Sequence, residues 1–372
     1  MKLKRFKPLT ASLCGVRSNG ANGGQAADTK ARPRARLQDV ASRAGVSLAT
    51  VSNVVNGHTN VSAATRAKVH SAIDELNYRP NMAARNLRRG RSGLIALAVP
   101  ELDIPYFAEL AAHLVSAAER HGWTVLVDQT GGDAERERLV MDGFRSQLID
   151  GLIFSPLATG RHELVARRDT TPMVLLGERV FDGPSDHVSI DNVAAARAAT
   201  EHLLQSGRRR IAAIGEQQRP SAGTARLRLR GYVDALAAAG FPVDDDLVVP
   251  CESYHRADGA AAMTALLSLP SPPDAIFCFN DLLALGAMRV LHERGIQVPA
   301  DVAVVGFDDI EDGRYATPSL TTVRPDKQGI AALAVQLLAE RLDEGAGHGP
   351  HARSPQELIA PFDLAVREST GA

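Results

Sequence analysis

The segment LQDVASRAGVSLATVSNVVN, from Leu37 to Asn56, constrains this chain most, because it has the pattern of two short helices joined by a tight turn. Apolar residues at helical spacing i, i+3, i+4 and i+7 give the first helix a single apolar face: Leu37, Val40, Ala41 and Ala44. Gly45 follows where a helix C-terminus takes a left-handed residue, and Ser47 stands where an N-cap belongs. The pattern predicts a helix-turn-helix.

The second helix has one face for a core and one face that suits DNA. The inner face carries Val51, Val54 and Val55. The outer face carries short, uncharged side chains: Ala49, Ser52, Asn53 and Asn56. An asparagine can bond adenine through two hydrogen bonds, and Leu48 or Ala49 can contact a thymine methyl. The alternative is a helical hairpin whose polar face is only solvated.

The charge of the chain is divided unevenly between its two ends. Residues 1–92 carry 17 Lys or Arg and 4 Asp or Glu, whereas residues 93–372 carry 25 and 39, so +13 faces −14. A basic front and an acidic body indicate that only the front meets a polyanion. Several arginines lie next to the helical segment rather than in the N-terminal tail: Arg79, Arg85, Arg88, Arg89 and Arg91.

Residues 1–35 are rich in Lys, Arg, Gly and Asn without apolar periodicity, which predicts a disordered basic extension. Ser62 can cap a third helix from Ala63 to Leu76, and its apolar residues would close a small three-helix core: Ala64, Val69, Ile73 and Leu76. We therefore expect a DNA-binding headpiece over residues 36–81 and a linker or short hinge helix over residues 82–92.

From Gly93 onward, short apolar runs alternate with amphipathic helical segments. The runs that read as buried strands are LIALAVP, WTVLVDQT, GLIFSP, PMVLLGE, RIAAIGE, LVVPCES, AIFCFND and VAVVGFDD. This alternation is typical of parallel sheets covered by helices on both faces. About 280 residues exceed one such sheet, so residues 93–369 are predicted to form two α/β lobes.

Cys14, Cys251 and Cys278 have neither metal-ligand nor redox spacing, which fits a reduced, cytoplasmic setting. Polar residues interrupt the start of the chain within a few positions, so a signal peptide is not expected. No apolar run approaches the roughly 20 residues of a membrane span.

The ordered set of motifs resembles the lactose/galactose repressor (LacI/GalR) family of bacterial transcription regulators. LQDVASRAGVSLATVSNVVNG resembles the headpiece signature of that family, and VSAATRAKVHSAIDELNYRPNMAARNLRRGRSGLIAL continues it into the hinge. PYFAEL, QLIDGLI, SIDN, FCFNDLLALGAM, VAVVGFDD, LTTVRP and VREST follow in the order of the ligand-binding body. The resemblance implies a small all-α helix-turn-helix headpiece and a two-lobed, periplasmic-binding-protein-like α/β body that binds an effector and dimerises.

The resemblance also implies which residues meet DNA. Base-reading positions fall on Leu48, Ala49 and Asn53, whereas Thr50, Ser52 and Asn56 would mostly contact phosphates or fix the helix. In the hinge, a leucine wedged into the minor groove matches Leu87. Ala83 and Ala84 match the small residues beside it, and Asn81, the last residue of the headpiece, completes the predicted DNA site.

The effector is expected in the cleft between the lobes, because doubly wound sheets bind ligands beyond the carboxyl ends of their strands. The family's ligand-contacting positions match Arg228, Tyr254, Asn280 and Asp308, with Tyr106 or Phe107 as the aromatic pair after the first strand. Such groups can bond vicinal hydroxyls and cover the apolar face of a sugar. Asn280 and Asp308 could instead be strand-end caps, and the aromatic pair could be core.

Two departures from individual family members narrow the expectation. The purine-binding member has an arginine where this chain has Ala222, which disfavours purine co-repression. The lactose-repressor member carries a C-terminal heptad for tetramers, and this chain stops soon after VREST, which implies a dimer. The sequence thus predicts a cytoplasmic, homodimeric repressor that binds a pseudo-palindromic operator. A small metabolite controls it, and a sugar is the metabolite that we expect.

The sequence disfavours two other classes of protein, a sugar-binding transport protein and an enzyme. A sugar-binding transport protein would need an export signal and would leave the first 90 residues without a role. An enzyme is disfavoured because the chain has no phosphate loop, no dinucleotide-binding glycine motif, no HExxH and no nucleophile elbow. The histidines are scattered, and His162 with Glu163 is expected on a surface helix. No metal or cofactor is predicted.

Overall fold

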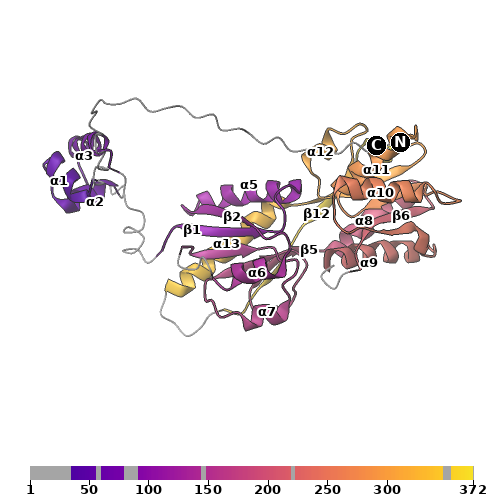
Figure 1. Cartoon of the computed structure of the whole chain (residues 1–372), viewed down its shortest axis with the longest axis horizontal. Helices are drawn as coiled ribbons and strands as arrows, with labels where there is room; N and C mark the ends of the chain where they lie inside the picture. Colours follow the sequence, from indigo (N-terminus) through magenta and orange to yellow (C-terminus); the bar gives the residue numbers. More distant parts are fainter. Residues whose placement is uncertain are drawn as a thin grey trace, which may run out of the picture. The chain divides into compact units, whose positions relative to one another are not determined.

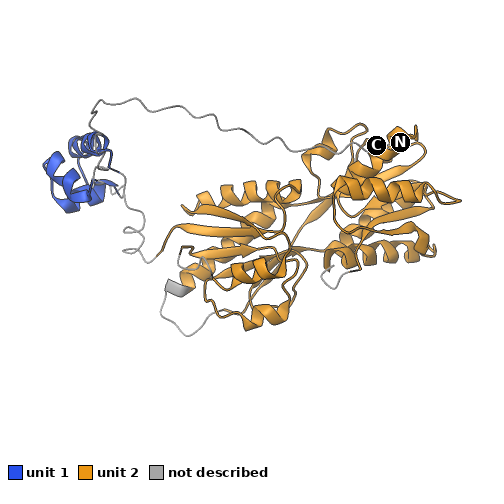
Figure 2. Ribbon diagram, in the orientation of Figure 1, with its two compact units in different colours: residues 1–81 blue, residues 82–372 orange. Residues whose placement is uncertain are grey.

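The computed structural model describes residues 35–55, 60–78, 91–143, 148–218, 223–346 and 353–371. The chain divides into two compact units, residues 1–81 and residues 82–372, which Figure 2 colours separately. We describe each unit by itself and call the described part of the first the headpiece and that of the second the body.

The headpiece consists of α1 (Leu37–Ala44), α2 (Leu48–Val55) and α3 (Ala63–Glu75). Its core is small, and each helix contributes one fully buried valine to it: Val40, Val51 and Val69. The turn between α1 and α2 has the expected chemistry, because Gly45 adopts φ 65°, a left-handed conformation that favours glycine. The helix-turn-helix is therefore confirmed.

Side-chain caps start the second and third helices as expected. The Thr50 amide donates to Ser47 Oγ (3.1 Å), and the Thr65 amide donates to Ser62 Oγ (3.3 Å). The core prediction was wrong at Ala64, which is exposed. Ala64 lies five residues before Val69, off the apolar face of α3, whereas Ala72 lies one turn after Val69 and is buried.

The body contains two six-stranded sheets, each covered by helices (Figure 1). The first sheet has the order β11-β5-β4-β3-β1-β2, and the second has the order β12-β10-β9-β8-β6-β7. All neighbouring strands are parallel except β10 and β12, which are antiparallel. The predicted pair of α/β lobes is confirmed.

The N-terminal lobe is built on the first sheet. Its strands are β1 (Leu94–Val99), β2 (Thr124–Gln129), β3 (Gly151–Phe154), β4 (Met173–Leu176), β5 (Asp186–Ile190) and β11 (Glu357–Ala360). Its helices are α5 (Pro105–Glu119), α6 (Ala134–Met141), α7 (Arg161–Ala166) and α13 (Lys327–Ala346).

The C-terminal lobe is built on the second sheet. Its strands are β6 (Ile211–Glu216), β7 (Val248–Pro250), β8 (Ala275–Cys278), β9 (Ala303–Phe307), β10 (Thr321–Pro325) and β12 (Phe362–Ala365). Its α-helices are α8 (Asn192–Gln205), α9 (Gly223–Ala238), α10 (Arg256–Leu266), α11 (Asp281–Glu293) and α12 (Glu311–Arg314), and its short 3₁₀ turns are Asp245–Leu247 and Glu368–Thr370.

The chain passes between the lobes three times: from β5 to α8, from β10 to α13, and from β11 to β12. Strands in the interior of the sheets are buried, as the continuous apolar runs predict; β3, β4, β8 and β9 contain only buried residues. The prediction of a buried strand was wrong for β2 and β7, which lie at the sheet edges and contain no buried residue. The carboxyl ends of β1, β4, β6, β8 and β9 supply residues to the space between the lobes. This arrangement places the ligand site where doubly wound sheets have it.

Candidate functional site

The first candidate site is the outer face of α2. Leu48 is 46% exposed, and Ala49 and Asn53 are exposed as well, so all three predicted base-reading positions face solvent. Thr50 and Ser52 are half-buried, and the Thr50 hydroxyl is hydrogen-bonded to Ser47 Oγ (2.8 Å). Thr50 thus fixes the start of the helix, which is one of the two roles expected for it.

The other predicted DNA-contacting residues lie outside the described part of the chain: Asn56, Asn81, Ala83, Ala84 and Leu87. The same holds for the expected basic extension, for most of the expected hinge, and for Ala222. Arg91, in the range expected for the hinge, donates to the Leu342 carbonyl and pairs with Asp343 (3.3 Å) near the end of α13.

The second candidate site is a cleft between the two lobes of the body, with a cavity of about 270 Å³. This volume lies just below the roughly 300–1,000 Å³ that is usual for small-molecule pockets. All six predicted effector-contacting residues line it, although they come from elements up to 202 positions apart: Tyr106, Phe107, Arg228, Tyr254, Asn280 and Asp308.

Arg228, on α9, is the central cation of the cleft and is 7% exposed. Its Nε donates to Asn192 Oδ1 (2.7 Å), its Nη1 donates to the Phe279 carbonyl, and its Nη2 lies 3.8 Å from Asp308 Oδ1. Its guanidinium lies 3.4 Å from the centre of the Phe307 ring, a cation–π contact. The side chain is therefore held rigid, and its charge is balanced by an adjacent carboxylate.

Asp308 follows β9 and is the second charged group of this pair. Burial raises the pKa of Asp308 to about 7, because the charged carboxylate loses its hydration. The charges of Arg228 and Lys327 oppose that rise in pKa, whereas Glu178 and Glu109 add to it. The cleft thus gathers several carboxylates around few cations.

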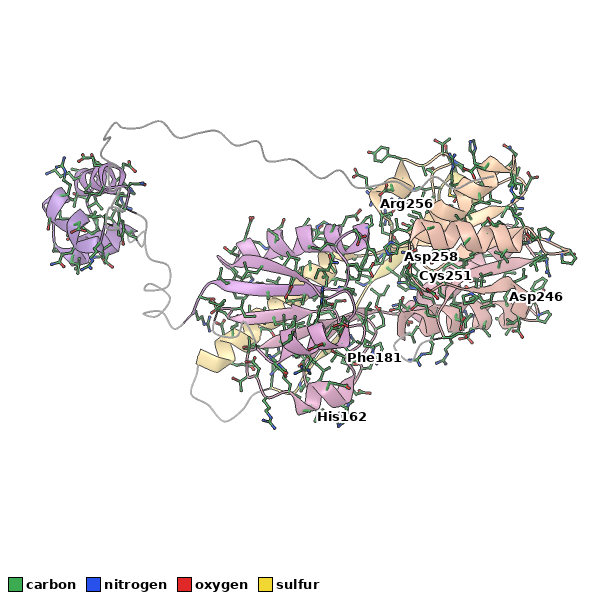
Figure 3. All side chains as sticks on the ribbon, in the orientation of Figure 1. His162, Phe181, Asp246, Cys251, Arg256 and Asp258 are labelled. Atoms are coloured by element: carbon green, nitrogen blue, oxygen red, sulfur yellow. The ribbon has the colours of Figure 1, made fainter. Side chains whose placement is uncertain are left out.

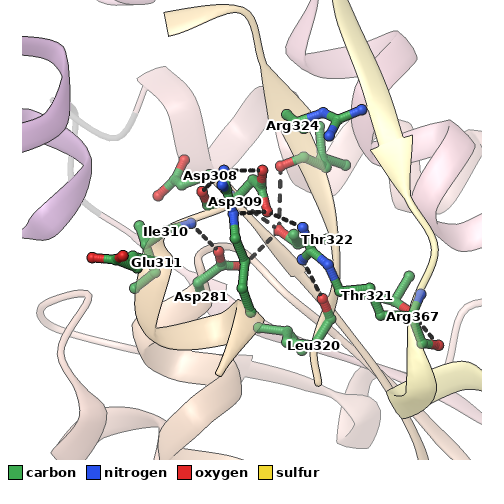
Figure 4. A network of polar contacts seen from close by, with 12 residues as sticks. Asp281, Asp308, Asp309, Ile310, Glu311, Leu320, Thr321, Thr322, Arg324 and Arg367 are labelled. Atoms are coloured by element: carbon green, nitrogen blue, oxygen red, sulfur yellow. Dashed lines mark hydrogen bonds and ion pairs between the residues drawn. The ribbon is translucent and has the colours of Figure 1, made fainter. Parts of the chain in front are cut away.

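The backbone that presents Asp308 is unusual, because Asp308 has φ 108° and Asp309 has φ 48°. Side chains other than glycine rarely adopt these conformations, so the surrounding structure must hold them. Asp309 is fully buried and accepts from Arg314 Nη2 (2.7 Å) and from Arg367 (Figure 4). The Asp308 side chain therefore cannot drift out of the cleft.

Asp281, at the start of α11, supports the same turn from below. Its carboxylate accepts from the Thr322 hydroxyl (2.6 Å) and from the Ile310 amide (2.9 Å), as Figure 4 shows. Burial, together with the nearby Asp308 charge, raises the pKa of Asp281 well above its ordinary value. Within the network of Figure 4, Asp308 lines the cavity, and the hydrogen bonds of Asp281 and Asp309 hold the turn that presents Asp308.

Asn280 both caps a helix and lines the cleft. Its Oδ1 accepts from the Leu283 amide (2.9 Å) at the start of α11, and its Nδ2 donates to the Tyr254 carbonyl (3.0 Å). Tyr254 in turn donates from its hydroxyl to the Gly215 carbonyl (2.8 Å). The capping role that the sequence left open for Asn280 is thus present. The separate hydrogen bond from its Nδ2 positions Tyr254 at the wall of the cavity.

Tyr106 and Phe107, in the first turn of α5, form an edge-to-face pair with ring centres 5.3 Å apart. Both line the cleft from the N-terminal lobe and pack against the core behind it. Burial, and secondarily the charges of Glu178 and Asp308, raise the pKa of the Tyr106 phenol. An aromatic wall opposite polar groups is suited to a sugar ring.

The cleft also contains polar residues that the sequence analysis did not single out: Ser155, Glu178, Ser189, Gln217 and Thr224. Glu178 follows the expected strand PMVLLGE, so the rule that ligands bind beyond strand carboxyl ends was a signal that could have found it. No comparable signal marks Thr224, because it lies inside a helix.

Other residues that could carry chemistry have structural roles. Cys251, labelled in Figure 3, and Cys278 are buried free thiols, and burial raises the pKa of both. His162, also labelled in Figure 3, is exposed on α7, and Glu163 accepts from the Gly160 amide (3.0 Å) as part of the cap of that helix. Within the described ranges, no group of His, Cys, Asp and Glu could hold a metal ion, and no helix is long and apolar enough to cross a membrane.

Comparison with known families places the chain. Residues 36–81 match the model of the bacterial regulatory proteins of the lacI family, and residues 200–370 match a periplasmic binding protein-like domain. The ribose operon repressor of Escherichia coli strain K12 is 35% identical over 315 residues, which cover 83% of this chain and 94% of that repressor. The chain belongs to the LacI family of transcriptional regulators, and its close relatives are transcriptional repressors rather than enzymes.

Solved structures agree with this assignment. The lac repressor dimer bound to operator and the anti-inducer ONPF has a TM-score of 0.77 and 30% identity, and the match covers 91% of this chain and 100% of that one. The transcriptional regulator CelR in complex with cellobiose has a TM-score of 0.65 and 32% identity, over 90% of this chain and 100% of that one.

Proposed function

We propose that this protein is a transcriptional repressor that binds a pseudo-palindromic operator as a homodimer and is controlled by a small sugar in the cleft. The observation that carries the proposal is the combination, in one chain, of an outward-facing α2 with an enclosed cleft around Arg228 and Asp308. The similarity to an operator-bound repressor dimer and to a cellobiose-bound regulator supports both halves. As a DNA-binding repressor it would act in the cytoplasm.

For DNA, we propose that Leu48, Ala49 and Asn53 contact base edges from α2 in the major groove. Thr50, Ser52 and Asn56 would hold the helix against the phosphate backbone. Leu87 would be the apolar wedge that enters the minor groove, unstacks a base step and kinks the DNA. The residues that would contact DNA beside it are Asn81, Ala83 and Ala84.

For the effector, we propose that Arg228, Asn280 and Asp308 bond sugar hydroxyls. Tyr106, Phe107 and Tyr254 would cover the apolar face of the ring. Ligand in the cleft would change the angle between the lobes and hence the separation of the two hinges in a dimer. The effector controls DNA binding only if it binds the two lobe arrangements with different affinity.

The experiment starts with selection of a binding site from random DNA by the full-length protein, followed by anisotropy titration of that site with and without sugars. We expect a two-fold-related site whose affinity changes when one sugar is added. A selected site without two-fold symmetry would contradict the dimer, and an affinity that no sugar changes would contradict sugar control.

A variant of Leu87 tests the proposed contact of the hinge with DNA. Leu87→Ala should weaken binding to the selected operator by more than it weakens binding to nonspecific DNA, because only the specific complex uses the wedge. Equal losses on both DNAs would remove Leu87 from the proposed minor-groove contact while leaving α2 as the reading helix.

A further inference from the structure

Glu178 connects the two lobes at the cleft. It lies just beyond β4 in the N-terminal lobe and is half-buried at the cavity wall. Its Oε2 accepts a hydrogen bond from the hydroxyl of Thr224 (3.1 Å), in the first turn of α9 in the C-terminal lobe. The backbones approach closely here, because a Cβ on Gly223 would lie 2.7 Å from the Glu178 carbonyl oxygen. Glu178 is therefore held at the N-terminus of α9.

The position matters because of what a helix N-terminus ordinarily binds. The first amides of a helix carry partial positive charge and form a ready site for a phosphate or another anion. In the 16-residue α9 this end opens on the cleft, and the carboxylate of Glu178 already lies beside it. The protein supplies its own anion at the place where the phosphate of a ligand would be attracted.

Carboxylates outnumber cations among the charged residues that line the cavity. The described lining carries four carboxylates and two guanidiniums: Glu101, Glu178, Glu252, Asp308, Arg179 and Arg228. The N–H groups of Arg228 are directed at Asn192, the Phe279 carbonyl and Asp308, so the donors of the central cation already have partners within the protein. Among the described residues, Glu178 forms no ion pair that would offset its own charge.

We propose that Glu178 is a specificity-determining residue, which makes the cleft accept unphosphorylated, hydroxyl-rich sugars and reject their phosphate esters. The inference rests on the proposed function, in which a sugar binds the cleft. Carboxyl oxygens accept hydrogen bonds, so Glu178 and Asp308, one from each lobe, suit the hydroxyl donors of a sugar. They repel a phosphate group, which has only acceptors and negative charge.

The expected size of the discrimination follows from Coulomb's law. Two unit charges about 5 Å apart at an effective dielectric constant of about 20 repel each other enough to lower affinity by roughly 100-fold. The Glu178 charge acts at Asp308, since it contributes to the raised pKa of Asp308. A phosphate between them would meet both charges.

The test is calorimetric titration of the full-length protein with four matched pairs: ribose and ribose 5-phosphate, glucose and glucose 6-phosphate, fructose and fructose 6-phosphate, and cellobiose and cellobiose 6′-phosphate. For the sugar that binds, we expect its ester to bind at least about 100-fold more weakly. In Glu178→Gln the gap should narrow by about 10-fold or more, because the ester gains affinity while the amide still bonds hydroxyls.

Glu293→Gln is the matched control, because Glu293 is an exposed glutamate on α11 that pairs with Arg289 (2.7 Å) away from the cleft lining. It should keep the wild-type gap. An ester that binds wild type as tightly as its sugar, or a gap that Glu178→Gln leaves unchanged, would overturn the proposal. Binding by none of the sugars would overturn it too.

The wild-type titrations decide the proposal even if Glu178→Gln does not fold. The proposed function is measured separately, by whether the bound sugar changes operator affinity. Sugar-dependent operator binding without discrimination against the ester would sink the role of Glu178 alone. Discrimination without any effect on operator binding would sink the proposed control of DNA binding alone.

Discussion

The outer face of α2 and the cleft of the body are built in opposite ways. On α2, Asn53 and Ala49 are exposed, and they come from one segment of eight residues. In the cleft, Arg228 and Asp308 are each 7% exposed and are held by partners from several elements. A surface that meets a long, rigid polyanion must be presented outward, whereas a site for a small molecule must enclose it and be organised in advance.

The two sites also differ in what supports them. The headpiece has a small core of valines and alanines, so its stability is marginal by the size of its core alone. The cleft is supported by the buried polar network of Figure 4, in which the loss of one partner leaves another uncompensated. We therefore expect the headpiece to respond to small changes in packing and the cleft to changes in charge.

The largest expected effect comes from Arg228→Ala. Removing the cation leaves Asp308 without its partner and the Asn192 amide oxygen without its donor, which costs about 3–5 kcal/mol for a buried pair. We expect the sugar response of operator binding to disappear, with the affinity of the ligand-free protein for DNA near the wild-type value.

Anisotropy titration of the operator, with and without sugar, measures both quantities. Arg230→Ala is the matched control, because Arg230 lies on the same helix and its side chain is 72% exposed. A variant at Arg228 that still responds at the wild-type sugar concentration would show that the cleft assignment is wrong.

Added salt should separate the two sites next. DNA affinity should fall by about 1,000-fold between 50 and 200 mM salt, because contacted phosphates release counterions. Sugar affinity should change little over the same range, because the charges that line the cleft are fixed and an uncharged sugar releases no ions. Parallel titrations of DNA and sugar measure the difference. An operator affinity that stays flat with salt would contradict a role for the basic front.

Val51→Ala should then damage the headpiece alone. Val51 is fully buried between the helices, and removing two methyl groups costs about 2 kcal/mol of stability. We expect weaker operator binding and unchanged sugar binding, measured by anisotropy and calorimetry. Val165→Ala is the matched control, because Val165 lies in the body and is 62% exposed. It should change neither operator binding nor sugar binding. Equal damage to sugar binding by Val51→Ala would mean that the two units are not independent.

The last expected effect is a pH dependence from Asp308, which is spread over several pH units. Its pKa is about 7 in the folded protein and about 3.9 in an unfolded chain, so the folded state holds the proton more tightly. The stabilisation from this group is complete below about pH 4 and is lost as the pH rises towards 7, by about 1 kcal/mol per pH unit.

Asp308→Asn removes the titration and nearly keeps the shape of the side chain. Urea unfolding at pH 5, 6 and 7 should therefore show the variant gaining free energy of unfolding relative to wild type as the pH rises. A difference between variant and wild type that stays constant from pH 5 to pH 7 would contradict the raised pKa.

Much of the fold could be predicted because its signals are local. The Gly45 turn, the Ser47 and Ser62 caps and the alternation of apolar runs with amphipathic helices depend on neighbours within a few positions. Strands β5, β10, β11 and β12 were not predicted as strands. β11 and β12 contain exposed or half-exposed residues, so their apolar pattern is weak, and only pairing with distant strands selects them.

The rule for doubly wound sheets gave the place of the candidate cleft, whereas its particular residues were predictable only through the resemblance to a family. Arg228 and Asn280 stand in helical contexts that any α/β protein could have, and nothing local marks them as neighbours. Their meeting depends on the second sheet bringing α9 and α11 to the same edge. Glu178 had a signal in its place beyond the expected strand PMVLLGE, but its contact with Thr224 of the other lobe had none.

The amino-acid sequence by itself determined that this chain carries a helix-turn-helix, because helix periodicity, caps and a left-handed glycine act over a few residues. It also determined the α/β character of the body, because buried parallel strands need continuous apolar runs. Only the tertiary structure decided which charges share the cleft, because residues such as Glu178 and Asp308 are 130 positions apart, and the raised pKa of Asp308 depends on burial that no local pattern encodes.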